Sequence, residues 1–113
     1  ALIAAMHKLD NLVVIVECNG FQAMGKVGDI LDIGDPTKKF AAFNWAVGDL
    51  PGHDYEALEE ALEHRHKGSP TAIFAVTTKG KGWKRAEDNN LYHYKQLSQE
   101  EYEEAKKELH EKV

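Results

Sequence analysis

Two short apolar runs, LVVIV at residues 12–16 and TAIFAV at residues 71–76, limit the folds that are open to this chain. Both are rich in β-branched residues, and neither alternates between apolar and polar positions. That pattern is typical of strands covered on both faces of a parallel sheet, in which helical crossovers join successive strands. We therefore expect an α/β fold with a parallel sheet and helices on both of its faces.

Helical patterns separate the two runs. Pro36 suits the first turn of one helix, and Asp54 can cap a second helix, which Gly68 ends. Residues 45–47 predict a short strand between these two helices. Strands and helices thus alternate along the chain, as they do in α/β domains with a parallel sheet.

Two further helices are expected near the ends of the chain. Apolar residues recur at helical spacing over residues 2–9, so a helix is already under way at Ala1 and we expect the chain to be part of a larger fold. Ser98 and Glu101 form a capping box for the last helix, whose glutamate-rich face is expected to be solvated. Apolar positions predict the buried sides of three of the helices: Phe40, Ala41 and Phe43; Ala57, Leu58, Ala61 and Leu62; Tyr102, Ala105 and Leu109.

The composition is that of a globular protein, and we expect a single domain over residues 1–113. Hydrophobic residues make up 42% and charged residues 29%, and no apolar run approaches the roughly 20 residues that span a bilayer. The net charge of −5 argues against a general nucleic-acid binder, although lysines and an arginine crowd residues 79–85. The lone Cys18 excludes an internal disulfide and a cysteine-based zinc site, and the cytoplasm is the expected compartment.

A long segment rich in Gly and Asp, residues 19–35, follows the first apolar run and opens with Asn19-Gly20. In open α/β sheets ligands bind beyond the carboxyl ends of the strands, so this segment is a candidate site. Asn-Gly favours an ordinary turn. The alternative is that the Asn19 side-chain oxygen and a nearby backbone carbonyl bind a magnesium or calcium ion that also holds phosphate. The pattern alone leaves both interpretations open.

The segment after the second run, TTKGKGWKRAEDNNLYHY at residues 77–94, is the other candidate. Its glycines free the backbone to approach a ligand, and Lys79 and Lys81 could bind an anion. Repeats of Lys and Gly also occur in ordinary surface turns. His93 lies in this segment, which makes it a candidate for proton transfer or phosphate contact.

Several segments taken together resemble the transketolase family, specifically the diphosphate-binding domain of these thiamine-diphosphate enzymes. The segments that carry the likeness are HKLDNLVVIVECNGFQAMG, GHDYEALEEAL, PTAIFAVTTKGKGW, and EDNNLYHY followed by EEYEEAKKEL. The resemblance extends over essentially all 113 residues, with these segments in the order and spacing expected of the family. The likeness is greatest to short, split transketolases whose amino-terminal half is a separate polypeptide, so the chain looks like the second half of that domain.

The resemblance implies a metal site at the end of the first strand. The family's cofactor motif begins with Gly-Asp-Gly and ends in an asparagine, and Asn19 stands at that asparagine. Its side chain and the backbone carbonyl of Phe21 would thus bind Mg²⁺, and Gly20 would lie with them at the cofactor.

It also implies roles in the second segment. His93 falls where the family has a histidine near the cofactor diphosphate, implicated in proton transfer, and Lys79 and Gly80 would border thiamine diphosphate. The reaction of the family moves a two-carbon ketol unit between sugar phosphates, with carbon chemistry that the cofactor supplies.

A partner is expected because this chain contains no Gly-Asp-Gly. The resemblance implies a complementary chain or segment that carries this motif and the pyrimidine-binding domain, in a hetero-oligomer, and an isolated chain that is inactive. Two alternatives are a non-catalytic interaction or scaffold subunit derived from this fold, and a fragment of an enzyme like deoxyxylulose-phosphate synthase, which shares a similar Lys-Gly-Lys-Gly stretch.

Overall fold

The computed structural model describes residues 1–111, which divide into two compact units. The sheet unit consists of residues 1–18 and 33–77, and the loop unit consists of residues 19–32 and 78–111. The last two residues of the expected domain, 112 and 113, lie outside the described part of the chain.

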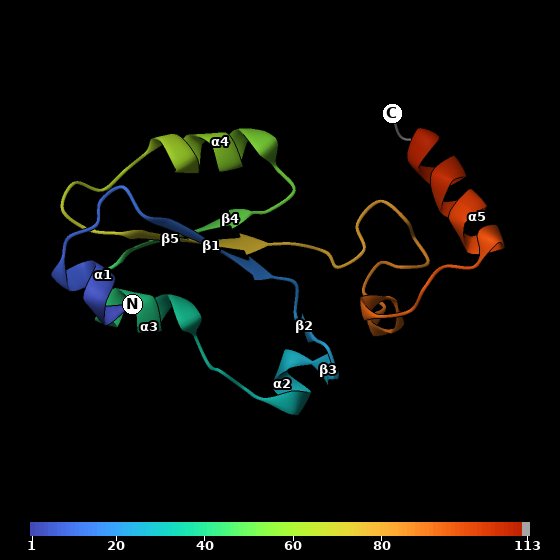
Figure 1. Cartoon of the computed structure of the whole chain (residues 1–113), viewed down its shortest axis with the longest axis horizontal. Coiled ribbons are helices and arrows are strands. Elements are labelled where there is room, and N and C mark those ends of the chain that lie inside the picture. Colours follow the sequence, from blue (N-terminus) through green and yellow to red (C-terminus); the bar gives the residue numbers. More distant parts are fainter. Residues whose placement is uncertain (112–113) are drawn as a thin grey trace. The chain divides into compact units, whose positions relative to one another are not determined.

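A parallel sheet forms the centre of the sheet unit (Figure 1). Its strands are β1 (Val13–Cys18), β4 (Ala46–Pro51) and β5 (Thr71–Val76), in the order β1-β5-β4. Both pairings are parallel. The helices of this unit are α1 (Leu2–Met6), α3 (Pro36–Ala42) and α4 (Tyr55–Glu63). The expected α/β class with a parallel sheet is confirmed.

Helices cover both faces of the sheet, as the sequence predicts (Figure 1). On one face Ala72 and Phe74 of β5 form a buried cluster with Trp45, and α3 contributes Phe40, whose ring lies 5.2 Å from that of Trp45. On the other face α4 places Ala57 and Ala61 near β4 and β5. Since β5 lies between the other two strands, its side chains are the best buried in the unit.

β1 is less covered than its sequence predicts. The run at 12–16 was expected to be buried on both faces, but Ile15 is 50% exposed. Ile15 pairs with Ile73 and so shares the face that α4 covers. β1 is the edge strand farthest from β4, against which α4 packs, and its side chains on this face therefore remain open to solvent.

The helix starts in this unit match their sequence signals, and the helix ends match less well. Asp35 accepts from the backbone N–H groups of Thr37 and Lys38, and Asp54 accepts from that of Ala57. α4 ends at Glu63, before Gly68, and β4 begins one residue after the expected start at 45 and continues to Pro51 instead of ending at 47. Three side chains that were expected to be buried are exposed: Ala41, Phe43 and Leu62. The apolar faces that α3 and α4 turn to the sheet are therefore narrower than the sequence predicts.

The loop unit contains more regular structure than the sequence predicts. Its elements are a hairpin of β2 (Phe21–Gln22) and β3 (Gly25–Lys26), then α2 (Val27–Ile30), η1 (Asn90–His93) and α5 (Gln99–His110). The hairpin and α2 lie in the segment predicted as one long loop. Strands of two residues are too short to leave a periodic pattern in the sequence, and that is why they were missed.

α5 begins with the predicted capping box of Ser98 and Glu101, and of its three predicted buried residues only Ala105 is buried. Ala105 is buried with Trp83 and Ala86, whereas Tyr102 and Leu109 are about half exposed. No helix among residues 1–111 is long and apolar enough to cross a membrane.

Candidate functional site

Asn19 closes a turn directly after β1. Its side-chain Oδ1 accepts a hydrogen bond from the backbone N–H of Phe21 at 2.9 Å. Gly20 between them has φ +76°, a left-handed conformation in which glycine is favoured. Asn19-Gly20 is therefore a turn, as the simpler interpretation predicts. An amide oxygen has two lone pairs, so this hydrogen bond does not by itself prevent the oxygen from binding a cation.

The hairpin pairing sets the direction of the Phe21 carbonyl. Phe21 lies opposite Lys26, while the neighbouring Gly20 carbonyl accepts from the N–H of Val27 at 2.9 Å. Hydrogen-bonded and non-hydrogen-bonded pairs alternate along an antiparallel ladder, so Phe21 and Lys26 form a non-hydrogen-bonded pair. The N–H and carbonyl of Phe21 thus both face away from β3, toward the side on which the Asn19 amide accepts. Two neutral oxygens, from Asn19 and Phe21, share this side.

The second candidate segment brings Lys79 to His93. The Lys79 ammonium lies 3.5 Å from Nδ1 of His93, whose ring is exposed at the end of η1. An ammonium group only donates, so Nδ1 of His93 is the acceptor side of this contact. The other ring nitrogen, Nε2, takes no part in this contact. This pairing of a proton carrier with a positive charge suits contact with a phosphate group.

Gly80 has a structural reason to be glycine. Its φ is +73°, and a Cβ at this position would lie 2.4 Å from the carbonyl oxygen of Ala86. The close approach of two backbone segments within residues 80–86 thus requires glycine, independently of any ligand. Lys79, which directly precedes this glycine, therefore lies beside a tightly folded part of the chain.

Asn90 connects the two candidate segments, and the sequence interpretation gave it no role. Its side-chain amide donates to the carbonyl oxygen of Ala23 at 3.0 Å, so the turn that ends at His93 is joined to the hairpin that begins at Phe21. The neighbouring asparagines of EDNNLYHY were a signal of local hydrogen bonding, because Asn side chains cap turns. All of the predicted site residues lie in the loop unit: Asn19, Gly20, Phe21, Lys79, Gly80 and His93.

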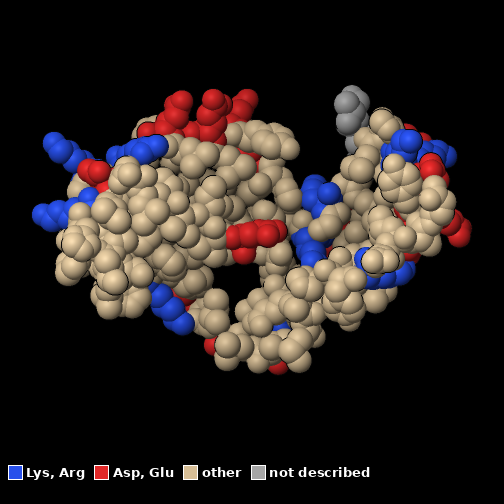
Figure 2. Space-filling view, in the orientation of Figure 1, with Lys and Arg blue, Asp and Glu red and all other residues tan. Residues whose placement is uncertain are grey.

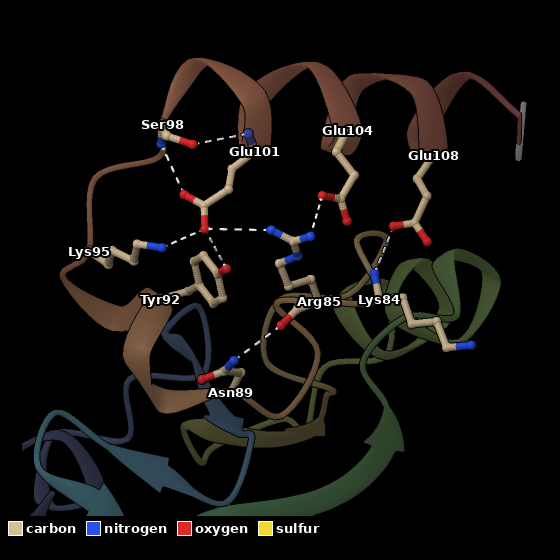
Figure 3. Close-up of polar contacts among 9 residues, drawn as sticks. All are labelled: Lys84, Arg85, Asn89, Tyr92, Lys95, Ser98, Glu101, Glu104 and Glu108. Carbon is tan, nitrogen blue, oxygen red and sulfur yellow. Dashed lines mark hydrogen bonds and ion pairs between the residues drawn. The ribbon is translucent and has the colours of Figure 1, made fainter.

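The loop unit contains a buried carboxylate, that of Glu101 (Figure 3). Glu101 is only 7% exposed, although the glutamates of α5 were expected to be solvated. Its Oε1 accepts from the Tyr92 hydroxyl at 3.0 Å and pairs with Lys95, and its Oε2 accepts from the N–H of Ser98 at 3.0 Å. The Lys95 ammonium and these other donors lower the pKa of Glu101 to about 2. The sequence pattern does not show this burial, because a capping box gives no sign that its carboxylate also meets a lysine and a tyrosine hydroxyl.

Glutamates of α5 also engage the basic segment at residues 79–85. Arg85 forms an ion pair with Glu104 at 2.7 Å, and Glu108 accepts from the backbone N–H of Lys84 at 2.9 Å. These contacts partly neutralise the basic segment. Elsewhere on the surface, acidic side chains gather over α4 (Figure 2).

Metal ligands of the usual charged kind do not cluster in the described residues. Within residues 1–111, no three His, Cys, Asp or Glu side chains lie close enough together to hold a metal ion. The oxygens of Asn19 and Phe21 are neutral ligands of the kind that magnesium accepts together with phosphate and water.

The sequence of this chain matches a known protein family. Residues 1–112 match the family described as "Transketolase, thiamine diphosphate binding domain". The chain belongs to this family. The resemblance seen in the sequence is thereby confirmed, and thiamine diphosphate is the cofactor of this domain.

Relatives of this transketolase domain include components of split enzymes. The chain is 37% identical over 110 residues to one of the subunits of apulose-4-phosphate transketolase from Actinobacillus succinogenes, covering 96% of this chain and 40% of that protein. It is 31% identical over 111 residues to the 6-deoxy-6-sulfo-D-fructose transketolase subunit SqwG of a Clostridium species, again covering 40% of the relative. The chain thus spans well under half the length of these relatives.

A solved transketolase shares the fold. The crystal structure from Campylobacter jejuni superposes with a TM-score of 0.82 at 32% sequence identity, covering 96% of this chain and 17% of that one. The arrangement of strands and helices described above is therefore that of a segment of a transketolase.

Proposed function

We propose that this chain forms part of a transketolase-like enzyme, which transfers a two-carbon ketol unit between sugar phosphates. The family match over residues 1–112 carries the proposal. It is supported by the names of two relatives, which are subunits of transketolases acting on apulose 4-phosphate and on 6-deoxy-6-sulfo-D-fructose. Residues 1–113 would together make up the second half of the cofactor-binding domain, in the cytoplasm.

The Asn19 turn would contribute to a Mg²⁺ site. The Asn19 amide oxygen and the Phe21 carbonyl face the same side of the hairpin, and both are hard, neutral donors. Gly20 lets the chain turn sharply between them. The donor set of this chain therefore fits a magnesium ion that receives its remaining ligands from the cofactor diphosphate and from an acidic residue elsewhere.

Lys79 and His93 would act on the cofactor and substrate side of the site, with Gly80 allowing the backbone to pass close by. Thiamine diphosphate, when bound, supplies the carbon-centred chemistry of ketol transfer. The Lys79 ammonium, which faces Nδ1 of His93, would attract the diphosphate. His93 would hold or pass a proton at Nε2, the nitrogen that does not face Lys79.

A complementary chain or segment would supply the acidic ligand and the pyrimidine-binding domain. Because the relatives extend well beyond the matched region, and two of them are named as subunits, we propose a hetero-oligomeric assembly. The complementary part would bring Gly-Asp-Gly, whose aspartate adds the negative charge that a magnesium site needs.

Reconstitution tests this function. The full chain is combined with a complementary chain that carries Gly-Asp-Gly and the pyrimidine-binding domain, and cofactor binding and ketol transfer from a ketose phosphate are measured separately. Transfer that requires both chains supports the proposal. An assembly that binds thiamine diphosphate and Mg²⁺ but transfers nothing contradicts the catalytic role, and a stable assembly without cofactor binding favours a scaffold subunit.

A further inference from the structure

We propose that Glu101 is the positioning residue for His93, because its carboxylate, on α5, binds residues on both sides of the histidine. The consequence for catalysis rests on the proposed function of His93. The positioning itself is a property of the loop unit and can be measured in the chain alone.

Donor groups of four residues surround the Glu101 carboxylate (Figure 3). Its carboxylate pairs with Lys95, accepts from the Tyr92 hydroxyl at 3.0 Å and accepts from the Ser98 N–H at 3.0 Å. Arg85 lies 3.8 Å from the same Oε1. All of these contacts converge on one side chain, so its removal would release several groups of residues 85–98 at once.

Tyr92, the residue before His93, is held at both ends of its side chain. Its ring packs against the buried Trp83 ring, with centroids 4.9 Å apart and planes at 66°. Its hydroxyl donates to Glu101. The apolar contact sets where the ring lies, and the hydrogen bond fixes the direction in which it points.

Lys95, two residues after His93, is held by contacts of both its side chain and its backbone. Its ammonium pairs with Glu101 and lies 5.2 Å from the centroid of the Tyr92 ring. Its backbone N–H donates to the carbonyl of Leu91 at 3.2 Å and so closes the turn around the histidine. Two residues that flank His93 in the sequence, Tyr92 and Lys95, thus both bind the carboxylate of Glu101.

His93 has few anchors of its own. It is exposed, its ring meets the Lys79 ammonium at 3.5 Å, and the neighbouring Tyr94 is 75% exposed. A four-residue 3₁₀ turn such as η1 has little intrinsic stability. The His93 ring lies edge-on to the Tyr94 ring, with centroids 6.3 Å apart, and meets Lys79. Tyr92 and Lys95, through Glu101, hold the turn that carries these groups.

Stability alone does not explain a carboxylate at this position. Well-packed apolar residues can replace buried ion pairs with little or no loss of stability. What a carboxylate adds here is directional contact with three donors, which an apolar side chain cannot provide. This favours a positioning role for Glu101.

Two variants and one control test the proposal. Tyr92→Phe removes one hydroxyl and keeps the ring contact with Trp83, while Glu101→Gln keeps the shape of the side chain and removes its charge. Glu104→Gln is the matched control, since Glu104 lies on the same helix and pairs with Arg85 alone among the contacts drawn in Figure 3. The readouts are the NMR resonances of the His93 ring and the backbone order parameters of residues 91–95 in the full chain.

In both test variants we expect the His93 ring resonances to shift and the order parameters to fall from about 0.85 toward about 0.6. Glu104→Gln should leave both unchanged. In the reconstituted assembly, Tyr92→Phe should lower kcat by about two- to tenfold, the range that one net hydrogen bond provides, with the KM for cofactor unchanged.

Unchanged His93 resonances and order parameters in Tyr92→Phe would overturn the proposal, as would an equal response in Glu104→Gln. Tyr92→Phe decides the matter even if Glu101→Gln fails to fold. The function of His93 is tested separately: if His93→Ala keeps full turnover, its proposed catalytic role falls, while the NMR readouts still decide whether Glu101 positions the ring.

Discussion

The side-chain oxygen of Asn19 accepts a hydrogen bond from the backbone nitrogen of Phe21 at 2.9 Å, which puts the two proposed magnesium ligands on one side of a short hairpin. A turn and a ligand set are thus not alternatives at this position. The hydrogen bond that makes the turn also orients the amide oxygen and the Phe21 carbonyl together.

Asn19→Ala should weaken Mg²⁺-dependent binding of thiamine diphosphate in the assembly by at least about tenfold, a loss typical even of groups that only orient a metal ligand. Titration calorimetry with and without Mg²⁺ measures it. Asn11→Ala, at the other end of β1, is the control and should bind normally. Equal affinity of Asn19→Ala and wild type would remove Asn19 from the metal site.

His93→Ala should lower kcat by about 10²-fold or more, the range of general acid–base catalysis, and change cofactor affinity much less. Steady-state kinetics of the assembly, with a cofactor titration, separates these effects. His110→Ala, at the end of α5, carries the same chemical change outside the site and should be neutral. Loss of cofactor affinity without loss of kcat would make His93 a binding residue.

The chain by itself should bind thiamine diphosphate and Mg²⁺ weakly or not at all, because the two neutral oxygens of Asn19 and Phe21 bring no negative charge to the ion. Calorimetry of the isolated chain measures this. Micromolar affinity would show that an aspartate from elsewhere is dispensable.

Gly80→Ala should destabilise the chain by about 1–3 kcal/mol, since an alanine there would take a left-handed conformation and press on the Ala86 carbonyl. The control is Gly28→Ala in α2, where a Cβ would meet no atom within 4 Å and a small gain is expected. Urea unfolding of both variants provides the comparison. If Gly80→Ala is as stable as Gly28→Ala, the close approach at Ala86 does not require glycine.

The stabilising effect of the Glu101 ion pair should disappear at low pH. The pKa of Glu101 is lowered from 4.5 to about 2 by Lys95 and its other donors, so the folded state binds its proton less readily than the unfolded state does. The stabilisation is therefore fully present above about pH 4.5 and is lost as the pH falls toward about 2.

Urea unfolding of wild type and Glu101→Gln at several pH values tests this. The difference in unfolding free energy should shrink steadily from pH 5 to pH 2. Asp35, whose pKa is also lowered to about 2 by Thr37 and Lys38, is present in both proteins and cancels in the comparison. A difference that stays constant over this range would show that the charge of Glu101 contributes no stability.

Much of the sheet unit could be predicted from the sequence, because its signals are local. The run at 71–76 coincides with β5, and Pro36 and Asp54 mark the starts of α3 and α4. The apolar pattern of β1 was also informative, but it could not show that Ile15 remains half exposed. Burial depends on which strand lies at the edge of the sheet, and no local pattern contains that order.

The candidate site was predictable only in part. Asn19, Lys79 and His93 follow from composition and position after strands, and from the family resemblance. The contact of Lys79 with His93, the link from Asn90 to Ala23 and the burial of Glu101 were not predictable. Each of them joins residues that only the folded loop unit brings to hydrogen-bonding distance.

By itself, the sequence determined the α/β class, the family and the chemical types of the site residues, since apolar periodicity, caps and motifs are properties of short segments. The tertiary structure alone decided which glutamate is buried. The sequence marks Glu101 only as a helix cap, but in the folded chain it alone of Glu101, Glu104 and Glu108 contacts the hydroxyl of Tyr92 and the ammonium of Lys95. A carboxylate is buried where donors converge on it, and that convergence exists only once the chain has folded.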